Sequence, residues 1–186
     1  MDEFAYELKI PKERVAVLIG KEGSVKKRLE EDTKTKMEVD SKEGDIVLRG
    51  EDALLLYSAR EVIKAIGRGF NPDVAMLLLK QDYAFELIPI TDFVGENHIV
   101  RIKGRVIGQD GKSRRIIEEL TESYICVYGK TVGIIGTHEN LVAAKRAIES
   151  LLSGSPHAGV YKFLEKRRKE LKRQEFLGPK DKDFLK

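Results

Sequence analysis

The chain has 186 residues, of which 41% are hydrophobic and 35% are charged, and its formal net charge is +3 at pH 7. This length suits one large or two small domains with modest cores. No apolar run approaches the roughly 18 residues that span a bilayer, no signal-peptide pattern opens the chain, and one cysteine excludes an internal disulfide framework. We therefore expect a cytoplasmic protein without a membrane partner.

The charge is distributed unevenly along the chain. Residues 1–69 carry 14 basic and 15 acidic side chains, residues 70–153 carry 10 and 11, and residues 154–186 carry 10 and 5. The positive surplus therefore lies in the last part of the chain. A nucleic-acid site in the first two regions must rest on local clustering of cations, with acidic side chains on other faces.

The first region predicts the order strand, helix, helix, strand, strand, helix. Residues 5–10 alternate in polarity as a strand does, and residues 13–19 fit a short helix. Ser24 is a candidate N-cap of the next helix. Residues 36–40 and 45–49 then predict a hairpin. The third helix has an inner apolar stripe of Leu55, Ala59, Val62 and Ile66.

The connector predicts a packed helix over residues 70–82. Asn71 and Pro72 fit the N-cap and first helical position, respectively. A flexible tether would be more polar. The connector residues that we expect to be buried are Met76, Leu77 and Leu79.

The second region repeats the plan, with strands at residues 85–90, 124–127 and 131–135. Residues 99–107 are assigned to a helix by their correspondence with residues 13–19, because Gly104 lowers helix propensity. Cys126 alternates with apolar neighbours in a strand, which predicts a packed thiol rather than a nucleophile.

A short Gly-x-x-Gly motif occurs twice, at Gly20 and Gly23 in the first copy and at Gly108 and Gly111 in the second. The matches extend beyond the two loops. At the spacing that separates Gly20 from Gly108, Leu29 matches Ile117 and Val39 matches Val127. Further along the chain the spacing is slightly shorter, and the matched pairs are Gly50 with Gly136, Leu55 with Leu141 and Arg60 with Arg146. The length difference falls in a loop between two strands, where it costs little. The sequence therefore indicates two copies of one fold.

A Gly-x-x-Gly turn between two helices brings backbone close to a ligand, because glycine has no Cβ. The N-terminus of the following helix attracts phosphate. This is the device with which a KH module clamps about four nucleotides of single-stranded RNA. We therefore predict an RNA-binding protein.

An ordered series of segments carries a resemblance to a known family. The series consists of Gly67-Arg68-Gly69-Phe70, Ala75-Met76-Leu77-Leu78, residues 104–112, Ile117-Glu118, Thr121, Ile134-Ile135-Gly136 and residues 154–161. Over nearly the whole chain it resembles the partner of Nob-one family, also called the Dim-two proteins, which are paired-KH assembly factors of the small ribosomal subunit. The resemblance implies an α+β fold with two tandem type I KH domains, each a three-stranded antiparallel sheet packed on helices.

With this resemblance we predict a first KH domain at 1–69, a connecting helix at 70–82, a second KH domain at 83–154, and a basic C-terminal helix and tail at 155–186. The resemblance implies that the ligand is single-stranded RNA from the 3′ region of small-subunit rRNA. It also implies the rRNA-processing endonuclease and the rRNA dimethylating enzyme as partners, and neither cofactor nor metal. Eukaryotic relatives tend to have a degenerate first loop, so the intact loop here resembles an archaeal form.

The candidate RNA-binding residues lie in and around both loops. In the second unit they are Arg105, Ile107, Gly108, Gln109, Asp110, Gly111, Lys112, Arg114 and Arg115, and in the first unit they are Ile19, Gly20, Lys21, Glu22, Gly23 and Lys27. Cations bracket the second loop, whereas Glu30 and Glu31 oppose those near the first. We predict that the second unit is the main site. Ile19 and Ile107 are candidates for an apolar groove floor or for core positions.

The basic stretch 160–174 has two interpretations, a docked helix with a solvated face and an additional contact with RNA backbone. The last residues of the chain, with Gly178-Pro179 and alternating lysine and aspartate, are expected to fray.

Other classes of function are weaker. Gly111-Lys112-Ser113 imitates the end of a nucleotide-binding loop, but Val106 stands where that motif requires glycine. The three histidines show no metal-ligand spacing, and no nucleophile stands with a base, so no enzyme is expected. Two alternatives remain open, a KH regulator of messages and a scaffold whose KH copies bind proteins.

Overall fold

The structure is a computed structural model that describes residues 4–177. The first unit forms a three-stranded antiparallel sheet, in the order β1-β3-β2, covered by three helices. Its elements are β1 (Phe4–Lys9), α1 (Lys12–Ile19), α2 (Ser24–Thr33), β2 (Lys36–Val39), β3 (Asp45–Gly50) and α3 (Ala53–Gly67).

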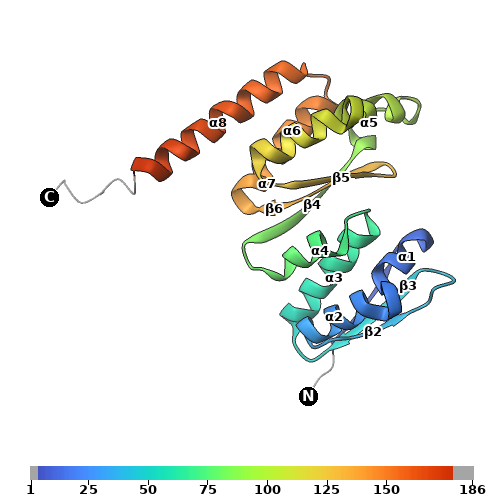
Figure 1. Ribbon diagram of the computed structural model, residues 1–186. Coiled ribbons are helices and arrows are strands. Elements are labelled where there is room, and N and C mark those ends of the chain that lie inside the picture. The colour runs from blue at the N-terminus through green and yellow to red at the C-terminus, as the bar shows by residue number, and fades with distance from the viewer. Residues whose placement is uncertain (1–3, 178–186) are drawn as a thin grey trace.

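The second unit repeats this arrangement with the strand order β4-β6-β5 (Figure 1). Its elements are β4 (Tyr83–Pro89), α5 (Ile99–Ile107), α6 (Lys112–Thr121), β5 (Tyr124–Tyr128), β6 (Thr131–Thr137) and α7 (His138–Leu152). The predicted α+β fold with two KH units is confirmed. The helix expected at 99–107 forms despite Gly104, which is exposed and faces open space.

Both units fasten the second helix to the following strand in the same way. An oxygen of Glu30 accepts a hydrogen bond from the backbone N–H of Met37 at 2.7 Å, and Glu118 does the same for Ile125 at 2.7 Å. Behind each lies a buried pair of hydroxyls, Thr33 with Thr35 and Thr121 with Ser123. These carboxylates satisfy backbone donors, so Glu30 does not simply oppose cations at the first loop as the sequence had indicated.

Two local predictions are wrong. Ser24 is the first helical residue of α2, and the N-cap is Gly23 in a left-handed conformation, with no capping bond from a side chain. In α3 the core residue is Leu56, which is fully buried, whereas Leu55 is half-exposed. Asp52 caps α3 by accepting hydrogen bonds from the N–H groups of Leu54 and Leu55. The rest of the predicted stripe, Ala59, Val62 and Ile66, is buried as expected.

The connector is two short turns, α4 (Pro72–Ala75) and η2 (Met76–Leu79), rather than one continuous helix. The predicted start is confirmed, because the Asn71 side chain accepts a hydrogen bond from the N–H of Asp73 at 2.8 Å and Pro72 follows. Met76 is buried as expected, but Leu78 replaces Leu77 and Leu79 as the other buried residue. The tight 3-10 turn changes which side chains face α3.

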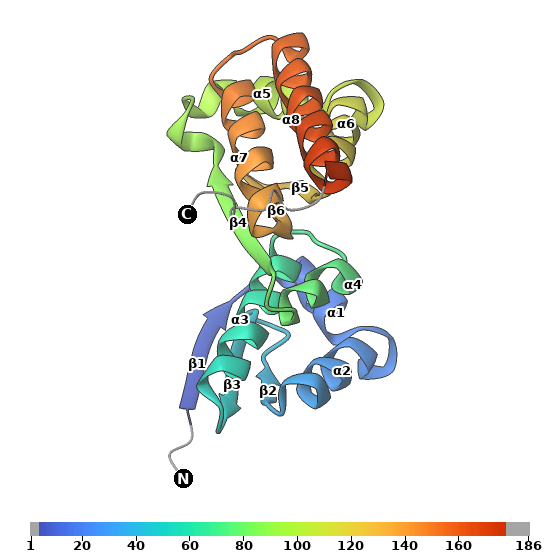
Figure 2. The same cartoon turned by 90° about the vertical axis from the view of Figure 1, so that its left-hand side faces the viewer.

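The second sheet is buried on both faces. One face packs on its own helices, and the other packs on the first unit through Phe85, Cys126 and Ile135. Phe70 meets Phe85 edge to face at 5.9 Å between ring centroids, and a Cβ on Gly133 would lie 2.7 Å from Phe70. This joint fixes the two units relative to each other (Figure 2). Burial in it raises the pKa of the Cys126 thiol, which agrees with the predicted packed cysteine.

A hydrogen bond crosses the joint from the Tyr128 hydroxyl on β5 to Glu13 on α1. This bond holds the pKa of Glu13 below its usual value and raises that of Tyr128. Because the folded-state pKa of Glu13 is depressed, its contribution to stability is present above its unfolded value of about 4.3 and is lost as the pH falls through the folded value.

Replacing Tyr128 with phenylalanine is therefore expected to raise the pKa of Glu13 toward its ordinary value, measured by NMR titration of the carboxyl group. Tyr124→Phe, on the same strand but with its side chain 43% exposed, is the control and leaves Glu13 unchanged. A Glu13 titration that is insensitive to Tyr128→Phe contradicts the contact.

The C-terminal helix α8 (His157–Leu177) packs on α6 and α7 with its first half, where Val160 and Leu164 are buried. Arg167 donates to the backbone oxygen of Glu139 at 3.0 Å, and Arg146 lies over the ring of Phe163 at 4.8 Å. The second half extends away from the rest of the molecule (Figure 1). The predicted fraying concerned residues 178–186, which lie outside the described residues. Within residues 4–177 no helix is both long and apolar enough to cross a membrane.

Candidate nucleic-acid interface

The two Gly-x-x-Gly loops have nearly the same backbone. The first glycine has φ 73°, ψ 175° at Gly20 and φ 74°, ψ 172° at Gly108. The loop's acidic residue is left-handed in both, at φ 55° for Glu22 and φ 51° for Asp110. Each loop leads directly into a ten-residue helix, α2 or α6. The sequence repeat is therefore also a repeat of conformation, and both loops present their backbone in the same way.

The glycines of a loop are required for different reasons. A Cβ on Gly108 would lie 2.6 Å from the backbone nitrogen of Ser113, and one on Gly20 would lie 2.8 Å from that of Val25. Around Gly111 there is nothing within 4 Å. The first glycine lets the loop close on its helix, whereas the second leaves open space where a ligand's backbone can approach.

Gly108→Ala is expected to destabilise the fold by about 3 kcal/mol, because its φ and ψ are almost confined to glycine and the new Cβ meets backbone. Gly111→Ala is expected to destabilise the fold by only about 1 kcal/mol, the cost of a left-handed conformation at a residue with a Cβ. Urea denaturation of both variants measures the difference. Equal losses of stability would contradict the distinction.

Cations surround the second loop. Gln109, Asp110, Lys112 and Arg115 are exposed, and Arg115 donates to the backbone oxygen of Asp110 at 2.6 Å. Arg114 is half-buried and lies 3.8 Å from Glu118. Arg115 thus holds the loop and keeps its own charge beside it. The first-turn N–H groups of α6 add partial positive charge at this point.

The first loop has a comparable arrangement. Lys21 and Glu22 are exposed, and the Cε of Lys27 lies 3.8 Å from the position of a Cβ on Gly23. Lys27 occupies the position that corresponds to Arg115. Arg28, by contrast, pairs with Asp73 of the connector at 3.0 Å. The two apolar candidates, Ile19 and Ile107, are both half-buried, and Ile19 packs against the first core.

Arg105 is the candidate whose guanidinium bonds to backbone carbonyls of its own unit. Its Nη2 donates to the backbone oxygen of Ser155 at 2.7 Å and its Nε to that of Leu151 at 3.4 Å, so it satisfies carbonyls at the end of α7. Arg14 does the same in the first unit, where Nε donates to Ile66 at 2.8 Å. In both copies, therefore, an arginine of the helix before the loop donates to backbone carbonyls at the end of that unit's third helix.

One polar side chain near the second loop was missed by sequence reasoning. Ser113 is buried in the first turn of α6, and its Oγ has no hydrogen-bond partner among the described residues. The corresponding residue in the first unit is Val25, which is half-buried. The signal in the sequence was that the polar Ser113 of the second copy corresponds to the apolar Val25 of the first. Over residues 4–177 no group of three histidine, cysteine or acidic side chains has an arrangement that could hold a metal ion.

Comparisons with known proteins agree with this geometry. A family model described as a eukaryotic-type KH domain (KH-domain type I), for the second KH domain of PNO1, matches residues 84–169, and a general KH-domain model matches residues 5–67. A KH domain-containing protein of Methanocaldococcus jannaschii is 49% identical over 174 residues, which are 91% of this chain and 76% of that protein.

The pre-rRNA-processing protein pno1 of Aspergillus oryzae is 31% identical over 125 residues. These are 65% of this chain but 48% of the fungal protein, so the chain spans about half the length of this relative. Among solved structures, Dim2p from Pyrococcus horikoshii is 45% identical with a TM-score of 0.82, covering 88% of this chain and 99% of that one.

A chain in the crystal structure of the a/eIF2alpha-aDim2p-rRNA complex from the same organism is also 45% identical, with a TM-score of 0.85 over 90% of this chain and 96% of that one. The similarity therefore includes both KH units and the connector that joins them. By its two type I KH folds and by these relatives, the chain belongs to the PNO1/Dim2 family of tandem KH-domain RNA-binding proteins.

Proposed function

We propose that the protein binds single-stranded RNA from the 3′ region of small-subunit rRNA and acts as a small-subunit assembly factor. The observation that carries this proposal is the pair of loops with one backbone conformation, each opening into a helix N-terminus. The relatives support the choice of RNA, since one is named a pre-rRNA-processing protein and another was crystallised in a complex with rRNA.

In this proposal the loop backbones of Gly108 to Gly111 and of Gly20 to Gly23 face RNA phosphates. Lys112 and Arg115 in the second unit, and Lys21 and Lys27 in the first, neutralise charge beside them. The second unit is the main site because α5, the helix before its loop, carries Arg101 and Lys103 and no acidic residue, whereas α1 carries Glu13. The bases lie over Ile19 and Ile107, and the acidic side chains of Glu22 and Asp110 are directed away from phosphate.

The protein's part in processing is to bind and orient RNA rather than to cleave or modify it. The rRNA-processing endonuclease and the dimethylating enzyme are the partners that the family resemblance implies, and the cytoplasm is the expected compartment. One relative's complex also contains a/eIF2alpha, which makes that factor a further candidate partner.

Crosslinking of bound RNA in cells, followed by sequencing, tests the proposed target. We expect the reads to accumulate at the 3′ end of small-subunit rRNA. Reads spread over messages would support the regulator alternative, and an absence of RNA above background would support a protein-binding scaffold.

The basic face of α8 is a candidate for additional contact with RNA backbone. Deletion of everything after Gly154 would remove Val160 and Leu164 from the core, so neutralisation of charge is the cleaner change. The exposed cations to be replaced by glutamine are Lys166, Lys169 and Arg173. If all three contact phosphates, the slope of log affinity against log salt should become shallower by about 2, at about 0.7 for each contact with a single strand. An unchanged slope would restrict α8 to packing or protein contacts.

A further inference from the structure

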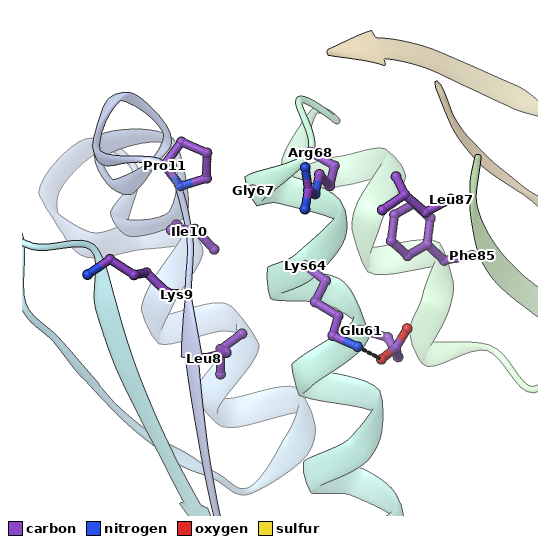
Figure 3. Close-up of a pocket in the computed structure, with 10 residues that line it drawn as sticks. All are labelled: Leu8, Lys9, Ile10, Pro11, Glu61, Lys64, Gly67, Arg68, Phe85 and Leu87. Atoms are coloured by element: carbon purple, nitrogen blue, oxygen red, sulfur yellow. Dashed lines mark hydrogen bonds and ion pairs between the residues drawn. The ribbon is translucent and has the colours of Figure 1, made fainter. Parts of the chain in front are cut away.

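A groove of about 650 Å³ lies where the two units meet, between β1, α3 and β4 (Figure 3). Its apolar lining comes from both units and includes Leu8, Pro11 and Leu87. Cations on its rim, Lys64 and Arg68, are both exposed. This size is within the usual range for ligand sites, about 300 to 1,000 Å³. The groove combines an apolar floor with positive charge at the edge.

The charge of the lining is positive. Three cations stand against one carboxylate, Glu61, which is already paired with Arg60 at 2.9 Å and Lys64 at 3.0 Å. Lys9 pairs with Asp45 at 3.1 Å, outside the groove lining. For Arg68 the described residues offer no ion pair within 4.0 Å. Lys9 and Lys64 therefore each have one carboxylate partner, and Arg68 has none among the described residues. An acidic group that enters the groove can pair with these cations.

The groove is bordered by two free strand edges. β1 and β4 are edge strands of their sheets. The N–H of Ile10 donates to Gly44 at 3.0 Å and that of Ile90 to Lys130 at 2.9 Å, so both are directed into their own sheets. Because backbone direction alternates along a strand, the N–H and C=O groups of Lys9, Phe85 and Leu87 face away from the sheets. Unpaired strand backbone is suited to an extended peptide.

The groove is separate from both candidate RNA sites. In each sheet the strand that follows the loop's helix, β2 or β5, lies at the opposite edge from β1 or β4. None of the candidate RNA-binding residues of either loop lines the groove. The lining has a single aromatic ring, Phe85, which also packs on Phe70, whereas single-stranded nucleic acid sites stack successive bases on several aromatic side chains. These features favour protein over nucleic acid as the occupant.

We propose that this groove binds a short extended segment of a partner protein in which acidic residues alternate with large apolar ones. The apolar side chains pack on Leu8, Pro11 and Leu87, and the carboxylates pair with Lys64 and Arg68. The site lets the protein hold RNA and a second protein at once, and it does not depend on which RNA the loops bind.

Fluorescence anisotropy with labelled synthetic peptides tests this proposal. The probe alternates glutamate with leucine and isoleucine, and two control peptides replace the glutamates with lysine or the apolar residues with serine. The full-length protein is compared with the double variant Lys64→Gln, Arg68→Gln and with the matched control Lys162→Gln, Lys166→Gln on α8. Unchanged RNA affinity of the first variant shows that it is folded.

We expect the probe to bind, both control peptides to bind more weakly, and the Lys64, Arg68 variant to lose affinity about tenfold, at about threefold for each exposed ion pair. The α8 control should bind the probe as the natural protein does, and saturating single-stranded RNA should leave the probe bound. Failure of the probe to bind, equal binding of the lysine peptide, no effect of the double variant, or displacement by RNA would each overturn the proposal.

Discussion

Replacing Gln109 with aspartate is expected to weaken RNA binding about 10- to 100-fold while the fold stays intact. The change creates two adjacent carboxylates between Gly108 and Gly111, at the point where phosphate is proposed to approach. Loss of charge-assisted contacts with one phosphate, worth about 1.5 to 3 kcal/mol, gives that range. Because Gln109 is exposed, the substitution disturbs no core packing. Titration of labelled RNA at fixed salt measures the effect.

The corresponding variant in the first loop is Lys21→Asp with Glu22→Asp, which creates the same Gly-Asp-Asp-Gly sequence and also removes the cation of Lys21. It should weaken binding less if the second unit is the main site. An equal or larger loss there would reverse the ranking of the two units. Unchanged affinity of Gln109→Asp would remove the second loop from the RNA site.

Replacing Gly133 with alanine is expected to release the joint between the two KH units. The new Cβ would lie 2.7 Å from Cε2 of Phe70 and 3.2 Å from Cε2 of Phe85, so one of these rings must move. Overpacking of this kind costs about 1 to 3 kcal/mol. The ring pair also holds the second sheet on the first unit, so the cost should appear as a change in the orientation of the units.

When two modules form one rigid body, the affinity for a strand that spans both is about 10² to 10⁴ times the affinity of either module alone. Gly133→Ala should therefore weaken binding of a long RNA strongly and binding of a strand of about four nucleotides only slightly. Gly95→Ala, where there is nothing within 4 Å, is the control. Equal effects of Gly133→Ala on long and short RNA would contradict a rigid joint.

Much of the fold could be predicted from the sequence because its signals are local. The repeat predicts that two units have the same order of elements, and Asn71 with Pro72 marks the start of the connector through one side-chain bond. The paired glycines predict the loops, because few other residues adopt their φ and ψ values. Even the helix at 99–107 follows from comparison of the copies, where propensity alone would fail.

The contacts that could not be predicted join residues far apart in the chain. Arg105 looks like an RNA contact because it stands beside the loop, yet its guanidinium reaches Ser155. Likewise, nothing near Tyr128 in the sequence indicates that it meets Glu13. A faint signal of the joint exists in β6, where Ile134 and Ile135 are both apolar although they face opposite sides of the sheet. Such a run indicates a strand buried on both faces.

Competition binding with three RNAs tests the central claim most directly. The RNAs are the single-stranded 3′ end of small-subunit rRNA, the same sequence closed in a hairpin, and a scrambled single strand. A KH groove admits unpaired bases, so the hairpin should compete poorly on shape alone, and the open 3′ end should compete best. Equal competition by the scrambled strand would contradict recognition of rRNA, and equal competition by the hairpin would contradict the KH mode of binding.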